Sequence, residues 1–122
     1  MTTNLFAATT ALGVTTFLAP ANTTANVLLS NAAASAKTYK INQIVAANTT
    51  GSAANVTVSV DNQAGGTGTD FPVVSAVSVP ANASLIVVDK TTAIYLMENQ
   101  SIVVTSGTSS AITYTISYED IS

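Results

Sequence analysis

Apolar and polar residues alternate along most of this chain, a pattern that is typical of β-strands with one buried face. In the clearest case, Ile112, Tyr114, Ile116 and Tyr118 share one face of a segment whose other face carries threonine and serine. The segment 55–61 alternates valines with polar residues in the same way. The pattern therefore predicts an all-β protein.

Turn residues recur between the apolar segments roughly every 8–12 positions, which is the spacing found in sandwiches and barrels. About eight or nine short strands are expected, and they predict a single antiparallel β-sandwich or jelly-roll-like domain over 15–122. Residues 1–14 have no charged side chain and no clear period, so an extended N-terminal arm or a first edge strand is expected there. The predicted strands lie over 16–19, 26–30, 39–46, 55–61, 71–79, 85–89, 94–97, 101–105 and 112–118.

The predicted strand over 39–46 contains a change of phase. Its apolar residues Ile41 and Ile44 are three positions apart, whereas the side chains of a regular strand repeat every two residues. One extra residue on one strand of an antiparallel pair produces such a slip. We therefore expect a β-bulge between these two isoleucines.

The motif Pro-Ala-Asn occurs twice, at 20–22 and at 80–82, each time between two apolar segments. Proline fixes φ and has no N–H group, so it suits the end of a strand. Asparagine and the hydroxyl residues that follow it can bond to nearby backbone groups and stabilise a turn. Each copy is therefore predicted to be a tight connection between two strands.

The segment 62–70 holds three of the six glycines in the chain and is predicted to be its longest flexible loop. Its Gly65-Gly66-Thr67-Gly68 run lacks the lysine and the strand–loop–helix setting of a phosphate-binding loop. We interpret the segment as a mobile surface hairpin loop.

Charged residues make up only 7% of the chain, against roughly 25% in ordinary soluble domains. The net charge is −3, and the only cations among the side chains are Lys37, Lys40 and Lys90. Nucleic-acid binding requires clustered basic residues, so that class is excluded, and a basic helix on a membrane surface is excluded on the same ground. No apolar segment approaches the ~20 residues that a membrane-spanning helix needs.

The low charge also bears on the edges of the predicted sheets. Lysine on an edge strand discourages pairing with the sheets of other molecules. A chain with three lysines has little of this protection. We therefore expect partner subunits to cover the edges and the protein to form a homo-oligomer.

No catalytic, cofactor-binding or metal-binding residue is predicted, and we expect the protein not to be an enzyme. The chain has no histidine and no cysteine, which excludes Ser-His-Asp triads and zinc sites built from those residues. Asp61 and Asp70 flank the same loop and are candidates for meeting there or for binding Ca²⁺ together with backbone carbonyls. Their spacing does not resemble a calcium-binding loop, so we interpret them as solvated turn residues. The remaining carboxylates are Asp89, Glu98, Glu119 and Asp120.

Aromatic residues are few and include no tryptophan. Tyr114 and Tyr118 lie on the apolar face of the last predicted strand and are expected in the core. Tyr39 and Tyr95 begin other predicted strands and are interpreted in the same way. Sugar-binding proteins usually present exposed aromatic rings, so carbohydrate binding is the weaker alternative.

Six segments follow one another in a recognisable order: 17–27 (FLAPANTTANV), 39–45 (YKINQIV), 54–60 (ANVTVSV), 77–85 (VSVPANASL), 94–102 (IYLMENQSI) and 112–121 (ITYTISYEDI). In this order they resemble the small virion structural proteins of tailed bacteriophages, especially phages of cyanobacteria and other aquatic hosts. The resemblance covers about residues 15–122. The chain departs from the pattern in its alanine-rich loop at 31–38 and in its N-terminus.

The resemblance implies a β-sandwich with an assembly role and no catalytic residues. The expected function is that of a capsid decoration (cement) protein on the outer capsid surface of a virion assembled in the cytoplasm of a bacterial host. Its expected partners are the major capsid protein and further copies of itself, with a trimer favoured, and residues 1–14 are expected to lie across a capsomer boundary. The alternatives are a tail, neck or fibre component that contacts the host through Gly65–Asp70, and a carbohydrate-binding module.

Overall fold

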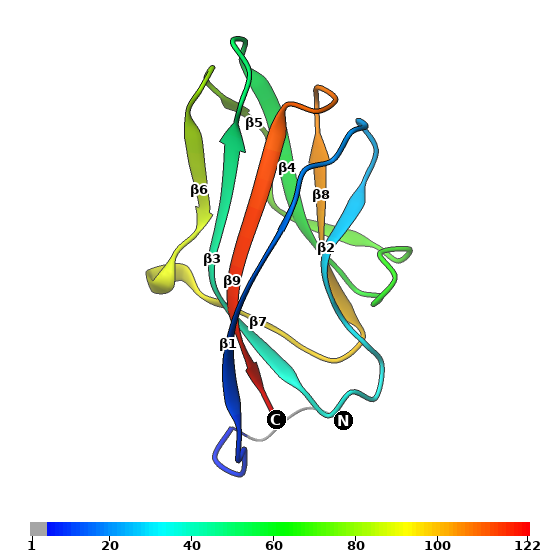
Figure 1. Cartoon of the computed structure of the whole chain (residues 1–122). Helices are drawn as coiled ribbons and strands as arrows, with labels where there is room; N and C mark the ends of the chain where they lie inside the picture. Colours follow the sequence, from blue (N-terminus) through cyan, green and yellow to red (C-terminus); the bar gives the residue numbers. More distant parts are fainter. Residues whose placement is uncertain (1–4) are drawn as a thin grey trace.

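In the computed structural model, which describes residues 5–122, the chain forms two antiparallel sheets that pack face to face (Figure 1). This arrangement confirms the predicted β-sandwich. In the first sheet, called sheet I here, the strand order is β1-β9-β3-β6, and the short strand β7 pairs with the other end of β3. In the second sheet, called sheet II, the order is β2-β8-β4-β5.

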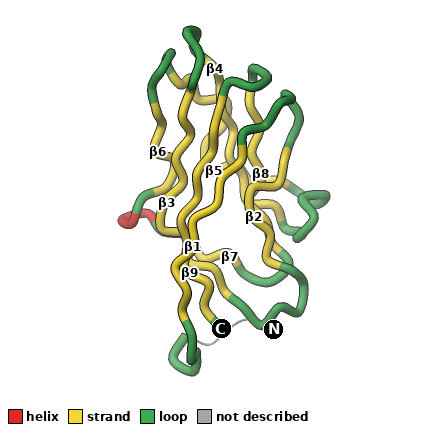
Figure 2. The backbone as a smooth tube through the Cα atoms, viewed as in Figure 1, coloured by secondary structure: helices red, strands yellow, loops and turns green. Residues whose placement is uncertain are grey.

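The strands account for most of the described residues, and one 3-10 turn, η1, projects between β6 and β7 (Figure 2). The strands of sheet I are β1 (Ala11–Leu18), β3 (Thr38–Asn48), β6 (Ser84–Val88), β7 (Ile94–Leu96) and β9 (Ile112–Ile121). Those of sheet II are β2 (Asn26–Asn31), β4 (Ala54–Asp61), β5 (Asp70–Val79) and β8 (Gln100–Ser106), and η1 spans Lys90–Thr92.

The first strand begins inside the segment that was expected to be an arm or an edge strand. β1 starts at Ala11 and pairs with β9 over its whole length. Thr10 precedes it and exchanges two backbone hydrogen bonds with Ser122, each of 3.1 Å. Residues 11–14 are therefore part of the sandwich, whereas residues 1–4 lie outside the described part of the chain.

The core lies between the two sheets and is built from alternate positions of the strands. On β9, Ile112, Tyr114 and Ile116 are buried, as their alternation predicts. Burying side chains of this size stabilises a fold by roughly 1.5–3 kcal/mol each relative to leaving them in water. The Tyr114 hydroxyl lies 2.9 Å from the Ser106 hydroxyl, so the one polar group of this buried ring has a partner.

The predicted β-bulge is confirmed. The pairing of β3 with β9 shifts register between Ile41 and Gln43. Asn42 is the extra residue, and the shift allows Ile41 and Ile44 both to face the core, where each is fully buried. The bulge therefore reconciles an irregular spacing in the sequence with one continuous strand.

Both Pro-Ala-Asn corners lead from one sheet to the other. The corner at 20–22 joins β1 of sheet I to β2 of sheet II, and the corner at 80–82 joins β5 of sheet II to β6 of sheet I. At the second corner the N–H of Ala83 donates to the carbonyl of Pro80 at 3.2 Å. Asn82 has a φ of 55°, a left-handed conformation that asparagine tolerates better than most residues. Both predicted connections between strands are confirmed, but only the second is tight, because residues 19–25 separate β1 from β2.

A buried asparagine ends one strand of each sheet: Asn31 in β2 and Asn48 in β3. The side-chain N–H groups of Asn31 donate to the carbonyls of Lys37 (3.0 Å) and Leu96 (3.1 Å). Because Leu96 belongs to sheet I, this single side chain links the two sheets. Each such amide satisfies backbone carbonyls that would otherwise be buried without a donor.

Candidate functional site

The edges of the two sheets differ in how well they are protected against pairing with another chain. On sheet II, β5 has two register shifts and contains Pro72, and β2 has one register shift. On the far side of sheet I, the edge is divided between the short strands β6 and β7. Bulges, prolines and short strands all discourage edge-to-edge pairing.

The edge formed by β1 has none of these protections. Its eight residues pair with β9 without a register shift, and they include no proline and no charged residue. Among residues 5–122, no strand pairs with the other side of β1. This strand, called the β1 edge below, is therefore the site where a strand from another chain is best accommodated.

The hydrogen bonds before β1 show which of its backbone groups point outward. Thr10 and Ser122 exchange both N–H···O bonds, and hydrogen-bonded pairs alternate with non-hydrogen-bonded pairs along an antiparallel ladder. Residues 11, 13, 15 and 17 consequently turn their N–H and C=O groups away from β9. They present a regular row of donors and acceptors at the β1 edge.

A row of side chains crosses the outer face of sheet I from this edge. The register pairs Phe17 with Thr115, Thr115 with Val45, and Val45 with Ile86, so these four residues lie side by side on one face. Phe17 and Ile86 are 74% and 60% exposed. This group, called the apolar row below although it includes Thr115, places two large apolar side chains, Phe17 and Ile86, at opposite edges of the face.

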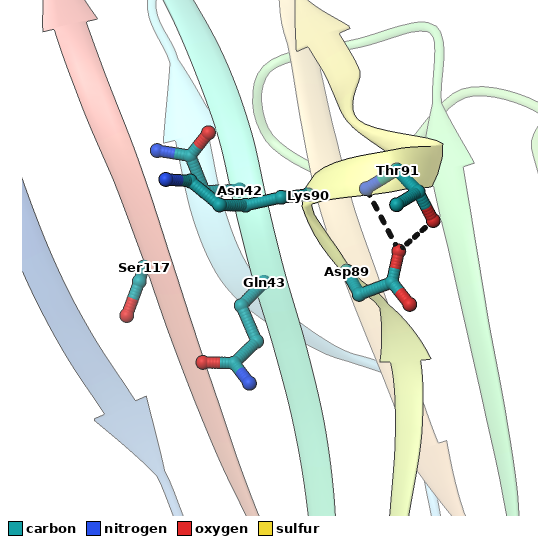
Figure 3. A pocket seen from close by; sticks show the side chains of 6 residues that line it. All are labelled: Asn42, Gln43, Asp89, Lys90, Thr91 and Ser117. Atoms are coloured by element: carbon teal, nitrogen blue, oxygen red, sulfur yellow. Dashed lines mark hydrogen bonds between the residues drawn. The ribbon is translucent and has the colours of Figure 1, made fainter.

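Beside the apolar row lies a polar hollow with a volume of about 500 Å³ (Figure 3). Figure 3 shows that β3 and β9 line one side of it and η1 with the preceding residue lines the other. All its lining residues have polar or charged side chains, although carbon atoms make up most of the wall; these residues are Asn42, Gln43, Asp89, Lys90, Thr91 and Ser117.

The carboxylate in this hollow is engaged in local structure. Asp89 caps η1, and its side chain accepts hydrogen bonds from the N–H and the hydroxyl of Thr91. These bonds favour the charged form and hold the pKa of Asp89 below its usual value. Asp89 therefore acts as a structural cap, and its lowered pKa does not suit a group that transfers protons near neutral pH.

Most charged groups of sheet I lie toward one end of β3 and β9, away from the apolar row. Lys37 and Asp120 form an ion pair of 3.0 Å, and Lys40 lies 3.9 Å from Glu119. The hydrogen bond to Asp120 raises the pKa of Lys37. Both pairs are partly exposed, so they contribute little to stability. They leave the face around the apolar row without net charge.

The glycine-rich segment between β4 and β5 is a surface hairpin loop, as predicted, and hydrogen bonds tie it to sheet II. The Ser101 hydroxyl donates to the carbonyl of Gln63 at 2.8 Å, and the Ser30 hydroxyl donates to the carbonyl of Ala64 at 2.6 Å. Gly66 lies so close to β2 that a Cβ at this position would be 2.7 Å from a methyl group of Val27. The loop lies across β8 and β2, and its anchors were not recognisable before the register was known.

Asp61 is not the solvated turn residue that the sequence indicated, because it is fully buried. Its Oδ1 accepts hydrogen bonds from the N–H groups of Gln63 (2.7 Å) and Gly68 (3.1 Å). Asp70, its exposed partner in the β4–β5 register, stands directly opposite. Burial, a hydrogen bond shared with Asp61 and repulsion between the two charges raise the pKa of Asp70.

Three of the four tyrosines pack as the sequence indicated. Tyr114 is buried, and the rings of Tyr39 and Tyr118 pack together at the margin of the core with centroids 4.9 Å apart. Tyr95 is 47% exposed, which corrects its assignment to the core. It stands on β7, whose three residues are too short a strand for alternation to decide which side faces inward.

Within residues 5–122, no helix has the length and apolar character needed to cross a membrane. In the same part of the chain, no three side chains of the types that commonly hold metals gather into one group. No protein-family model matches this chain, and no curated protein matches it.

Proposed function

We propose that this chain is a structural subunit of a tailed-bacteriophage virion, and specifically a capsid decoration (cement) protein that binds the outer capsid surface. Its partners are the major capsid protein and further copies of itself, with a trimer favoured. The observation that carries the proposal is the unprotected β1 edge adjoining the apolar row on a face without net charge. The order of the sequence segments, which resembles that of small virion proteins, supports the same role.

In this role, an extended segment of a neighbouring subunit adds to sheet I at the β1 edge. Main-chain hydrogen bonds to the outward groups of residues 11, 13, 15 and 17 provide affinity, and the apolar row provides contact area. Burial of Phe17 and Ile86 against a partner contributes roughly 1.5–3 kcal/mol for each side chain. A regular edge and a face without net charge suit a lattice, because neither requires a specific charged partner.

The stabilising effect on the shell follows from mass action. A protein that binds the assembled lattice and not its dissociated subunits shifts the equilibrium toward the lattice. Many weak contacts on one particle then act together, because a subunit held at one contact is already concentrated near the next.

Gly13 provides a matched pair of variants that test the β1 edge. The N–H of Gly13 points outward, and a Cβ at this position meets no atom within 4 Å. Gly13→Pro removes an outward N–H but no hydrogen bond to β9, whereas Gly13→Ala keeps the N–H. We expect Gly13→Pro to bind capsids that lack the protein at least about tenfold more weakly than wild type, with Gly13→Ala close to wild type.

Thermal unfolding of both variants shows whether the sandwich is intact, and sedimentation of capsids with added protein measures occupancy. Equal occupancy for the proline variant, the alanine variant and wild type would contradict the role of the β1 edge. Absence of any capsid binding by wild type would contradict the decoration role itself.

The alternative virion role is a tail, neck or fibre component that contacts the host, and the polar hollow beside η1 is the observation that favours it. Amide and hydroxyl groups of the kind that line the hollow can bind the hydroxyl groups of surface glycans. The number of copies per particle separates the two roles: hundreds indicate the capsid, and about a dozen or fewer indicate the tail. Binding of the isolated protein to a glycan array would instead favour the carbohydrate-binding role.

A further inference from the structure

The outer face of sheet II carries a row of polar side chains beneath the loop 62–69. The register pairs Ser30 with Ser101, Ser101 with Asp61, and Asp61 with Asp70, so these residues follow one another across four strands. The two serines hold the loop through its carbonyls. The two aspartates stand at the point where β4 and β5 enter the loop.

Asp61 and Asp70 are directly opposed on one face. Side chains in this relation have Cβ atoms about 4.5–5.5 Å apart, so the two carboxylates share one small volume. When both are ionised they repel each other, and neither can donate a hydrogen bond to the other. Either a proton shared between the two carboxylates or a bound cation relieves this repulsion.

One oxygen of the pair is buried without a partner. The Oδ1 atom of Asp61 is held by the N–H groups of Gln63 and Gly68, which orient the carboxylate. Its Oδ2 atom is inaccessible to solvent, and no hydrogen-bond donor in residues 5–122 reaches it. Leaving a charged oxygen in this state is costly, and buried carboxylates are normally paired or bound to a metal.

No lysine in the described part of the chain neutralises this pair. Lys37 and Lys40 are engaged with carboxylates of β9, and Lys90 lies on η1, which belongs to the connections of sheet I. The site therefore combines two negative charges, an oriented carboxylate and a buried oxygen with no donor.

We propose that Asp61 and Asp70 bind a divalent metal ion at the entrance of the β4–β5 loop, and that Ca²⁺ suits the site best. Ca²⁺ binds oxygen ligands in flexible geometry and accepts water in its remaining positions, which exposed Asp70 allows. Oδ2 of Asp61 and the carboxylate of Asp70 are the protein ligands. The ion fixes the start of β5 against the end of β4 and so holds the loop on sheet II, independently of the assembly role.

The test uses the full chain after treatment with a chelator and exchange into metal-free buffer. Calorimetric titration with CaCl₂ measures affinity, and native mass spectrometry measures the number of ions per chain. With two protein carboxylates, a dissociation constant of about 0.1–1 mM is expected. Asp70→Asn replaces a charged ligand with a neutral amide and leaves the hydrogen bonds of Asp61 in place, whereas Glu119→Gln removes an equal charge from sheet I.

The proposal requires one Ca²⁺ per chain, affinity at least tenfold lower in Asp70→Asn, and unchanged affinity in Glu119→Gln. Saturating Ca²⁺ should also raise the Tm of wild type and shift the backbone amide resonances of Gln63 and Gly68. Absence of saturable binding below about 10 mM overturns it, as does equal affinity in wild type and Asp70→Asn. A third outcome also overturns the proposal: Asp70→Asn is more stable than wild type, and by the same amount with and without Ca²⁺. In that case Asp61 and Asp70 share a proton and bind no metal ion.

Discussion

The side-chain amide of Asn48 donates a hydrogen bond of 3.1 Å to the carbonyl of Val79, joining the end of β3 in sheet I to the end of β5 in sheet II. The same amide also donates to the carbonyl of Ser52 at 2.7 Å. Its oxygen accepts from the N–H of Thr50 at 3.0 Å. One buried side chain therefore satisfies three backbone groups at a junction between the two sheets.

Replacing Asn48 with alanine should destabilise the protein strongly. The change leaves buried backbone groups without partners, at a cost of about 1–3 kcal/mol for each group that water cannot reach. We expect the free energy of unfolding in urea to fall by about 2–4 kcal/mol. Asn55→Ala, on the exposed side of β4, is the matched control and should change it by less than about 0.5 kcal/mol. If Asn48→Ala lowered the free energy of unfolding as little as Asn55→Ala, the hydrogen bonds of Asn48 would be dispensable.

The glycines of the β4–β5 loop should differ sharply in their tolerance of alanine. Gly66 has a φ of 71°, and a Cβ at Gly68 would collide with the side chain of Asn62. Gly65 has nothing closer than 3.9 Å to a Cβ. We expect Gly66→Ala and Gly68→Ala to lower the free energy of unfolding by about 1–3 kcal/mol each, and Gly65→Ala to leave it nearly unchanged.

Thermal unfolding of the three variants under one condition checks this prediction. A loop that moves freely would tolerate all three substitutions alike, and such a result would support the interpretation of a mobile hairpin. Faster hydrogen exchange at the backbone N–H of residue 68, which donates to Asp61 in wild type, would show in both destabilised variants that the loop has come away from Asp61.

The carboxylate of Asp89 should make stability depend on pH in the acidic range. Because hydrogen bonds to the Thr91 N–H and hydroxyl lower its pKa in the folded state, the carboxylate stabilises the fold above its unfolded pKa. That contribution is lost as the pH falls through the folded pKa. The difference in Tm between wild type and Asp89→Asn should therefore shrink between about pH 6 and about pH 2. A difference that is constant over this interval would show that the charge of Asp89 is not involved.

The apolar row should control self-association. Phe17→Ser removes an exposed ring from the end of the row that adjoins the β1 edge, without opening a cavity in the core. Phe71→Ser is the matched control, because Phe71 is also exposed, at 58%, but lies on the bulged edge strand β5. Light scattering should show a smaller oligomer for Phe17→Ser and the wild-type oligomer for Phe71→Ser. A monomeric wild-type protein would contradict the predicted homo-oligomer.

Much of the fold follows from local pattern in the sequence, because local pattern determines which side of a strand is buried. The valines of β4 and the alternating residues of β9 indicated strands with the correct buried face, and the spacing of Ile41 and Ile44 located the bulge. The two Pro-Ala-Asn corners were recognised as connections between strands. That each one joins the two sheets could not be predicted, because it depends on pairing between strands far apart in the sequence.

The features that pattern did not predict depend on register. Asp61 looked like an ordinary turn residue, and only its alignment with Ser101 and Asp70 shows that it is buried beneath a loop. A first edge strand within residues 1–14 was one of the two expectations, but its lack of protection was not apparent, because that depends on how the other three edges are built. Tyr95 was misplaced because its strand is too short to establish an alternation.

The pairing of β1 with β9 has a consequence for the order in which the protein folds during synthesis. Sheet II contains no strand beyond Ser106, so all its strands have been synthesised before Ile112 begins the last one. Sheet I lacks its central β9 until residues 112–121 have been made, and β1 is made about 100 residues before its partner. Such long-range pairing is slow to form and leaves strands exposed in the meantime. At ordinary rates of about 5–20 residues per second, β1 spends several seconds on each nascent chain without β9, close to the nascent chains of neighbouring ribosomes.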